Sequence, residues 1–172
     1  MEAKLDEKDL AILALIQENC KLTAKEIARK IDSPITTVFA KIKRMEDLGI
    51  IKEYRAILDA KTLGRGTTAF ILASVSYGAK GNTPQISQRD IANEIAKFPE
   101  VQEVHIITGD WDLLVKLKAE SVDVIGKFVI DKLRLVKGIE KTLTCMVFET
   151  CKETTALPIK TAKTKATAFI KK

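Results

Sequence analysis

Residues 22–49 have the sequence LTAKEIARKIDSPITTVFAKIKRMEDLG, in which two short helix-forming segments are separated by a tight turn. The first segment begins with Thr23 and Glu26 at the two positions of a capping box, where each side chain satisfies a free backbone N–H group. Leu22 and Ile27 occupy the positions of a hydrophobic staple, which fixes the direction of the chain as it enters a helix. The sequence therefore predicts a helix directly after Thr23.

The second segment is predicted to be a helix between Ser33 and Gly49. Ser33 is a good N-cap, Pro34 suits the first helical position, and Gly49 can end the helix in the left-handed conformation. The apolar stripe of this helix consists of Val38, Ile42 and Met45. Two short capped helices joined by a tight turn form a helix-turn-helix, whose second helix enters the major groove of DNA.

The outward face of the second helix combines small, hydroxyl and basic side chains, which suits a helix that must approach a DNA groove. Its members are Thr36, Thr37, Ala40, Lys41, Lys43 and Arg44. Lys and Arg bind phosphate, and Thr can reach either phosphate or base edges. A solvated charged face is the alternative for any single helix of this composition, so the DNA interpretation depends on the whole helix-turn-helix arrangement.

Segments on both sides extend this pattern. Asp6 is a good N-cap and Asp9 lies three residues later, which predicts a preceding helix. The apolar positions of that helix are Leu10, Leu13 and Ile16. Residues 50–57 are predicted to form a strand, the wing, in which Lys52 and Arg55 are available for backbone phosphates.

Net charge alone does not argue for DNA binding. The chain has 172 residues and a formal net charge of +6, but residues 1–60 contain 11 basic and 11 acidic side chains. Residues 158–172, PIKTAKTKATAFIKK, contain five lysines and no acid, and we expect this tail to be mobile and dispensable for folding. No apolar run approaches the ~18 residues of a membrane span, and the first ten residues lack a secretory signal, so we expect a cytoplasmic protein.

The residues that could perform catalysis or bind metal are few. Cys20, Cys145 and Cys151 form no C-x-x-C pair, so we expect buried, reduced thiols and no metal site. The single histidine, His105, lies in an apolar run that predicts a strand, where a structural role is expected. The sequence also lacks a Gly-rich phosphate loop, and we expect neither a cofactor nor an enzyme.

The second half of the chain predicts the element order βαββαβ. The expected strands are residues 67–77, 101–108, 112–117 and 141–148. One expected helix begins at Ser87 and ends at Pro99, with an apolar stripe of Ile91, Ile95 and Phe98. The other begins at the N-cap Ser121 and ends near Gly138, with Val122, Ile125, Val129 and Leu133 as its stripe. This order predicts a ferredoxin-like sheet with both helices on one face, and an exposed face of this kind commonly pairs with a second copy.

Two stretches carry a family resemblance. Residues 5–31 (LDEKDLAILALIQENCKLTAKEIARKI) and 36–64 (TTVFAKIKRMEDLGIIKEYRAILDAKTLG) resemble the Lrp/AsnC family of leucine-responsive, or feast/famine, regulators. The resemblance covers residues ~5–150 and implies an α+β protein whose dimers assemble further, up to octamers. Its winged helix-turn-helix would span residues 1–60 and its ferredoxin-like domain 61–150, followed by a Lys-rich tail, 151–172. Ser33-Pro34 lies one residue earlier than the family's usual Ser-Pro, which predicts an earlier helix start.

The same resemblance implies an effector site. Gly109-Asp110-Trp111-Asp112 is similar to the family's Gly-Asp-x-Asp turn, which helps to form an amino-acid pocket together with the start of the last strand. The implied residues are Thr108, Gly109, Asp110, Trp111, Asp112, Thr142 and Thr144. A turn offers backbone N–H groups to a carboxylate, and Asp can bind an ammonium group. The alternative is a Gly-Asp pair that only makes a hairpin turn.

Three functions are compatible with these features. The first is a transcription regulator that binds DNA as a symmetric oligomer and responds to an amino acid. The second is an architectural DNA-binding protein whose pocket is empty and whose Lys-rich tail adds unspecific affinity. The third is an enzyme or metabolite-binding domain on a ferredoxin-like scaffold, which the lack of a catalytic constellation disfavours.

Overall fold

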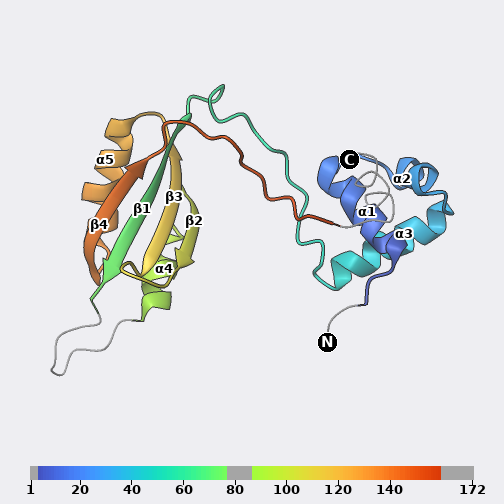
Figure 1. Ribbon diagram of the computed structural model, residues 1–172, viewed down its shortest axis with the longest axis horizontal. Helices are drawn as coiled ribbons and strands as arrows, with labels where there is room; N and C mark the ends of the chain where they lie inside the picture. The colour runs from blue at the N-terminus through green and yellow to red at the C-terminus, as the bar shows by residue number, and fades with distance from the viewer. Residues whose placement is uncertain (1–3, 77–86, 160–172) are drawn as a thin grey trace, which may run out of the picture. The chain divides into compact units, whose positions relative to one another are not determined.

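The computed structural model describes residues 4–76 and 87–159 (Figure 1). The chain forms two compact units. One unit contains the residues up to Ile57 together with the segment from Glu153, and the other is Leu58–Lys152. Residues 160–172, which contain all five lysines of the 158–172 segment, lie outside the described residues.

The first unit contains three helices whose starts follow the predicted caps. They are α1 (Glu7–Glu18), α2 (Ala24–Ile31) and α3 (Ile35–Asp47). At α1 the Asp9 N–H donates to Asp6 Oδ1 at 2.8 Å, and the Asp6 N–H donates to Asp9 Oδ2 at 2.9 Å. At α2 the reciprocal bonds between Thr23 and Glu26 measure 2.8 and 3.3 Å. Both capping predictions are confirmed.

The core between these helices is small. Its fully buried members are Ile12, Ile27, Ala28, Val38 and Met45. The predicted apolar stripe of α1 omitted its most buried apolar residue. Ile12 is fully buried, whereas the predicted Leu10 is only partly buried. Asp9 takes the other fully buried position of α1, so this helix directs a carboxylate as well as an apolar side chain inward.

The start of α3 differs from the prediction. The N-cap residue is Pro34 and it provides no side-chain cap, so the helix begins at Ile35 and not earlier. Asp32 has a left-handed backbone (φ +50°), and the Ser33 N–H donates to the Ala28 carbonyl at 3.0 Å. The Ser33 hydroxyl accepts from Lys8 Nζ at 3.3 Å and does not cap α3.

The end of α3 agrees with the prediction. Gly49 has φ +67°, in the left-handed region that favours glycine. Its N–H donates to the Glu46 carbonyl at 2.9 Å, and the Ile50 N–H donates to the Met45 carbonyl at 2.9 Å. These two bonds form a Schellman motif, which satisfies carbonyls at the helix end.

The predicted wing strand at residues 50–57 is wrong. This segment is irregular, and the strands of the described residues all belong to the other unit. The pattern of apolar and basic residues suits a strand, but a strand forms only when a second backbone accepts and donates its hydrogen bonds.

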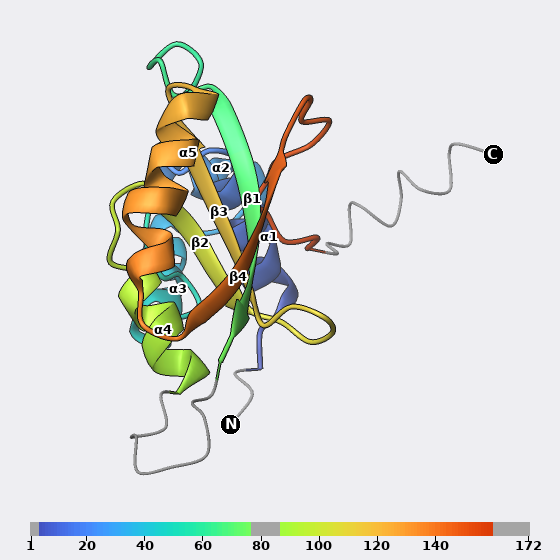
Figure 2. The same cartoon turned by 90° about the vertical axis from the view of Figure 1, so that its left-hand side faces the viewer.

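The second unit has the predicted βαββαβ order. Its elements are β1 (Thr67–Val75), α4 (Gln88–Ile95), β2 (Val101–Ile106), β3 (Leu113–Ala119), α5 (Val122–Asp131), the 3₁₀ turn η1 (Leu133–Leu135) and β4 (Ile139–Met146). The sheet is antiparallel with strand order β2-β3-β1-β4. Both helices lie on the same face of the sheet (Figure 2). The ferredoxin-like prediction is confirmed.

Alternation along the strands separates a covered face from an open one. Ile71, Ala73 and Val115 are buried beneath the helices. Leu72 lies on the other face, where its neighbours across the sheet are Leu114 of β3 and Leu143 of β4. The side chain of Leu143 is 46% exposed, so this open face presents apolar side chains to solvent.

Two groups of predictions on burial need correction. Ile125, Val129 and Leu133 are buried as predicted, but Val122 in the first turn of α5 is exposed, and Phe128 is buried instead. All three cysteines are free but exposed, because Cys20 lies in the turn after α1, Cys145 on the open face of β4, and Cys151 beyond that strand. No helix of the described residues is long and apolar enough to span a membrane.

Candidate functional site

The predicted DNA-facing residues of α3 lie together along one side of the helix. Thr36, Ala40 and Arg44 are four residues apart and therefore lie on one line. With Thr37 and Lys41 they line an open hollow on the surface of the first unit. Small side chains at Thr36 and Ala40 leave this surface accessible to a flat ligand such as a base edge.

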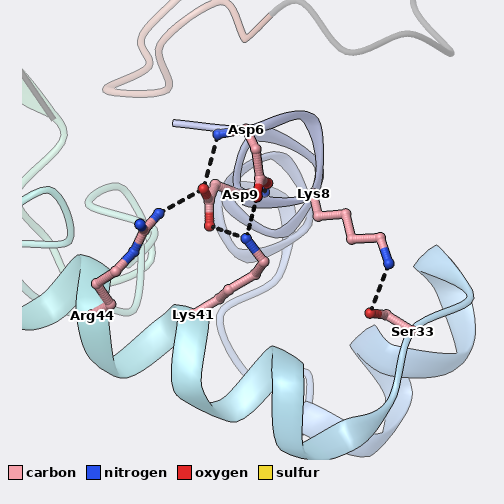
Figure 3. Close-up of polar contacts among 6 residues, drawn as sticks. All are labelled: Asp6, Lys8, Asp9, Ser33, Lys41 and Arg44. Carbon is pink, nitrogen blue, oxygen red and sulfur yellow. Dashed lines mark hydrogen bonds and ion pairs between the residues drawn. The ribbon is translucent and has the colours of Figure 1, made fainter. Parts of the chain in front are cut away.

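The basic side chains of this face are not equivalent, because two of them are held by carboxylates of α1 (Figure 3). Lys41 Nζ lies 2.5 Å from Asp6 Oδ2 and 3.0 Å from Asp9 Oδ1. Arg44 Nη2 lies 2.7 Å from Asp9 Oδ2. We call Asp6, Asp9, Lys41 and Arg44 the α1–α3 cluster. Its two carboxylates and two cations sum to zero net charge.

Charge pairing in the α1–α3 cluster shifts the pKa values of Asp6 and Lys41. The hydrogen bond from Lys41 and the backbone N–H of Asp9 lower the pKa of Asp6 to about 2. The same contact with Asp6, reinforced by Asp9, raises the pKa of Lys41. Opposite charges at short range favour the charged form of both partners. Asp6 and Lys41 therefore stay ionised at neutral pH.

Three other basic side chains are exposed on α3 and on the segment that follows it. Lys43 and Lys52 are exposed and form no ion pair with any residue that the structure describes. Arg55 is 77% exposed, and its Nε lies 2.9 Å from Glu53 Oε1. Phe39 was not predicted, yet it is 65% exposed on α3. Its position outside the apolar stripe of the helix is the signal that could have identified it.

Tyr54 fixes the segment that follows α3. Its hydroxyl donates to Glu46 Oε1 at 2.7 Å. Burial, together with this carboxylate, raises the pKa of Tyr54 to about 12. The irregular segment that carries Lys52 and Arg55 is thus attached to the last turn of α3.

The predicted effector turn lies between β2 and β3. Gly109 has φ +117°, a conformation that side chains other than glycine rarely adopt. Asp112 is engaged within the protein: its carboxylate accepts from the Val75 N–H at 2.7 Å and from Gln88 Nε2 at 2.6 Å. Gln88 was not predicted, and it links this turn to α4.

The strand residues of the predicted effector site lie close to the turn in the sheet. The Asp112 N–H donates to the Ala73 carbonyl at 3.0 Å, and Ala73 pairs with Thr142 of β4. Thr142 Oγ1 accepts from Arg134 Nε at 3.2 Å, and no sequence signal pointed to Arg134. Thr144 pairs with Ile71, which lies two residues before Ala73 in β1. Thr108 and Asp110 are exposed and Trp111 is partly buried.

Comparison with known families decides the identity of the chain. A family model described as "Lrp/AsnC ligand binding domain" matches residues 68–157, and one described as "Winged helix-turn-helix DNA-binding" matches residues 5–52. The chain belongs to the Lrp/AsnC family of transcriptional regulators. It is a DNA-binding regulator whose second unit is a domain for small-molecule ligands.

Individual relatives support this membership. An uncharacterized HTH-type transcriptional regulator of Pyrococcus abyssi is 40% identical over 149 residues, covering 87% of this chain and 96% of the relative. The HTH-type transcriptional regulator FL11 of Pyrococcus horikoshii is 34% identical over 160 residues, covering 93% and 100%. The crystal structure of a Neisseria meningitidis transcriptional regulator in complex with L-Met has a TM-score of 0.81 at 29% identity, covering 90% and 97%.

Proposed function

We propose that this Lrp/AsnC regulator binds operator DNA through the exposed side of α3 and that a free amino acid bound at the 108–112 turn changes that binding. The observation that carries the DNA part is the line of Thr36, Ala40 and Arg44 beside an open hollow on α3. Lys43, Lys52 and Arg55 are exposed on α3 and on the segment that follows it, and their charges suit backbone phosphates.

The turn at Gly109 suits the α-carboxylate of an amino acid. Glycine in a positive-φ conformation presents its backbone N–H without a side chain in the way, and nothing lies within 4 Å of the position that a Cβ would take. The carboxylate of Asp112 is already bound to Val75 and Gln88, so Asp110 is the better partner for the α-ammonium group. We propose that Trp111, which is partly buried, packs against the ligand side chain. Thr142 and Thr144 complete the proposed site.

An amino acid is the ligand class that the relatives favour. The Neisseria meningitidis regulator is described in complex with L-Met, and it shares 29% of its residues with this chain. For such a ligand to regulate, it must bind one DNA-binding state better than another, and typical coupling changes affinity roughly 5–150-fold.

The open face of the sheet supports a two-fold dimer. Leu72, Leu114 and Leu143 form a row across β1, β3 and β4 on the face opposite α4 and α5. A second copy of the same face would remove this apolar row from water. We propose this dimer as the DNA-binding unit, with further assembly up to an octamer, acting in the cytoplasm.

Calorimetric titration tests the effector proposal. The twenty amino acids are first screened by thermal shift, since a ligand that binds only the native state raises the melting temperature. The ligands that raise it are then titrated into wild type and Gly109→Val, while operator binding is measured in parallel. We expect binding only to wild type and unchanged operator affinity of the ligand-free variant. Equal binding to both proteins would show that the turn is only a hairpin.

An architectural DNA-binding protein is the alternative function. The five lysines of residues 158–172 favour it, because uncompensated lysines add unspecific, salt-sensitive affinity. The two functions differ in the ratio of operator affinity to random-DNA affinity, measured with and without amino acids at several salt concentrations. A ratio near one that no amino acid changes would favour the architectural protein.

A further inference from the structure

The two cations of the α1–α3 cluster differ in burial, which separates their roles. The side chain of Lys41 is only 17% exposed, whereas that of Arg44 is 48% exposed. Lys41 is held by two carboxylates and Arg44 by one. Lys41 is therefore the internal counter-charge of the cluster, and Arg44 is the member that can also bind a ligand.

Asp9 does not need Arg44 to remain satisfied. Its carboxylate is fully buried, and it also accepts from the Asp6 N–H at 2.9 Å and from Lys41 Nζ at 3.0 Å. A buried carboxylate requires hydrogen-bond donors and a counter-charge, and these two partners provide both. The additional bond to Arg44 constrains that guanidinium more than it supports Asp9.

A guanidinium has five N–H donors in a rigid, planar fork. Only Nη2 of Arg44 contacts Asp9, and within the described part of the chain no contact uses its Nε or Nη1. Arg44 is one of the residues that line the hollow, together with Thr36, Thr37 and Ala40. Holding one corner of the fork removes side-chain freedom before DNA arrives, which lowers the entropic cost of binding.

The Asp9 carboxylate compensates the positive charge of Arg44, and this affects whether Arg44 binds a phosphate or a base. A phosphate is attracted by net positive charge, and the Asp9 carboxylate beside Arg44 opposes that attraction. A guanine edge is uncharged and accepts two hydrogen bonds at O6 and N7 from one guanidinium. The geometry and the charge balance both favour the base edge.

We infer that Asp9 is a positioning residue that holds Arg44 for bidentate contact with a guanine of the operator. This inference rests on the proposed binding of DNA by α3. Lys41 contributes to the fold of the unit and not to base recognition.

The decisive comparison is between Asp9→Asn and Asp6→Asn. Both variants remove one negative charge from the same cluster, and both positions contact Lys41, but only Asp9 contacts Arg44. Asparagine is also a good N-cap at position 6. We therefore expect both variants to bind random DNA more tightly at low salt, while only Asp9→Asn loses about tenfold in the ratio of operator to random-DNA affinity.

The operator is first selected from a random pool with the wild-type protein, and 7-deazaguanine, which lacks the N7 acceptor, then replaces each guanine in turn. We expect one guanine per half-site to matter to wild type and to Asp6→Asn but not to Asp9→Asn. If Asp9→Asn does not fold, Arg44→Lys replaces it in the comparison. Lysine keeps the positive charge at this exposed position and loses only the planar guanidinium that could bind guanine in a bidentate way. If Asp9→Asn does fold, it should lower the ratio no further in the Arg44→Lys background.

Each other outcome has a defined meaning. Loss of affinity for all sequences alike in Asp9→Asn would show that Arg44 binds phosphate, and an unchanged ratio would show that the cluster is purely structural. Both results overturn the inference while leaving DNA binding by α3 intact. Failure of the wild-type protein to select any sequence would instead overturn the proposed function.

Discussion

Gly109 and Gly126 differ in backbone conformation, and this decides what a methyl group does at each position. Gly109 has φ +117°, whereas Gly126 lies inside α5, and an added Cβ meets no atom within 4 Å at either site. Strain therefore separates the two positions, and steric clash does not. We expect Gly109→Ala to lower the free energy of unfolding by about 1–3 kcal/mol. Gly126→Ala should raise it by about 0.5–1 kcal/mol.

Urea unfolding of the two variants measures both changes. The pair controls for the chemistry of the substitution, because each variant adds one methyl group to a glycine. A Gly109→Ala variant at least as stable as wild type would mean that a side chain at this position is not strained.

Asp6 predicts how the first unit responds to acid. Its pKa is lowered from 3.8 to about 2 in the folded protein, chiefly by the hydrogen bond from Lys41. A group whose pKa is lower when folded contributes stability that is fully present above its unfolded pKa. That contribution is lost as the pH falls through the folded value. We therefore expect the stability of the helical unit to decrease between about pH 4 and about pH 2.

Thermal unfolding followed by circular dichroism between these pH values tests this expectation. Asp6→Asn should make the dependence shallower while keeping the N-cap. A variant with the same acid dependence as wild type would show that Asp6 does not contribute.

At the scale of single residues, the sequence predicted local partners and missed distant ones. The reciprocal bonds of Asp6 and Asp9 span three residues and follow from a capping pattern. The bond from Arg44 to Asp9 spans 35 residues, and nothing in the neighbourhood of either residue signals it. The sequence similarly suggested that Asp112 is available for a ligand. Its hydrogen bond with Gln88 forms only when α4 packs beside the turn, so the sequence near Asp112 gives no sign of it. Whether a charged residue is free is a property of the tertiary fold.

At the scale of helices, α3 carries basic residues of two kinds. Lys43 is exposed and has no ion pair among the described residues, while Lys41 is bound by Asp6 and Asp9. Lys43→Gln should lower affinity for all DNA sequences and reduce the slope of log affinity against log salt by ~0.9, with little change in stability. Lys41→Gln should mainly lower stability, since it leaves the buried Asp9 with less compensation.

Fluorescence anisotropy on one operator and one random duplex, at four salt concentrations, distinguishes the two lysines. The melting temperatures of both variants provide the second measurement. If Lys41→Gln changed the salt slope as much as Lys43→Gln without loss of stability, the division between the two residues would be wrong.

The start or end of a helix was predictable where the residues that satisfy its backbone groups lie within a few positions of it in the sequence. The N-cap of α1, the capping box of α2 and the glycine at the end of α3 each satisfy nearby backbone groups, and all three were confirmed. Residues 50–57 have a strand-like composition but no partner strand among the described residues. The start of α3 was misplaced because the hydroxyl of Ser33 bonds to Lys8, which belongs to another helix.

At the scale of the whole molecule, the two units bury their apolar residues in separate clusters. Ile12, Val38 and Met45 belong to the small cluster of the helical unit, and the larger one lies between the sheet and its two helices. The larger cluster uses only one face of the sheet. The row of Leu72, Leu114 and Leu143 on the other face is therefore apolar without belonging to either cluster of buried residues.

We expect the open face to hold two copies together, and Leu143→Asp to separate them. Leu143 is 46% exposed at the centre of β4, and a charge buried without a partner in a dimer interface is strongly unfavourable. Val122→Asp is the matched control, because Val122 is 60% exposed on α5, on the helical side of the domain. Light scattering at micromolar concentration should show a dimer or a larger even assembly for wild type and Val122→Asp, and a smaller species for Leu143→Asp. The loss of the dimer should also reduce operator affinity, since two half-sites about 34 Å apart require two recognition helices. A monomeric wild-type protein, or an assembly that Leu143→Asp leaves intact, would show that another surface joins the copies.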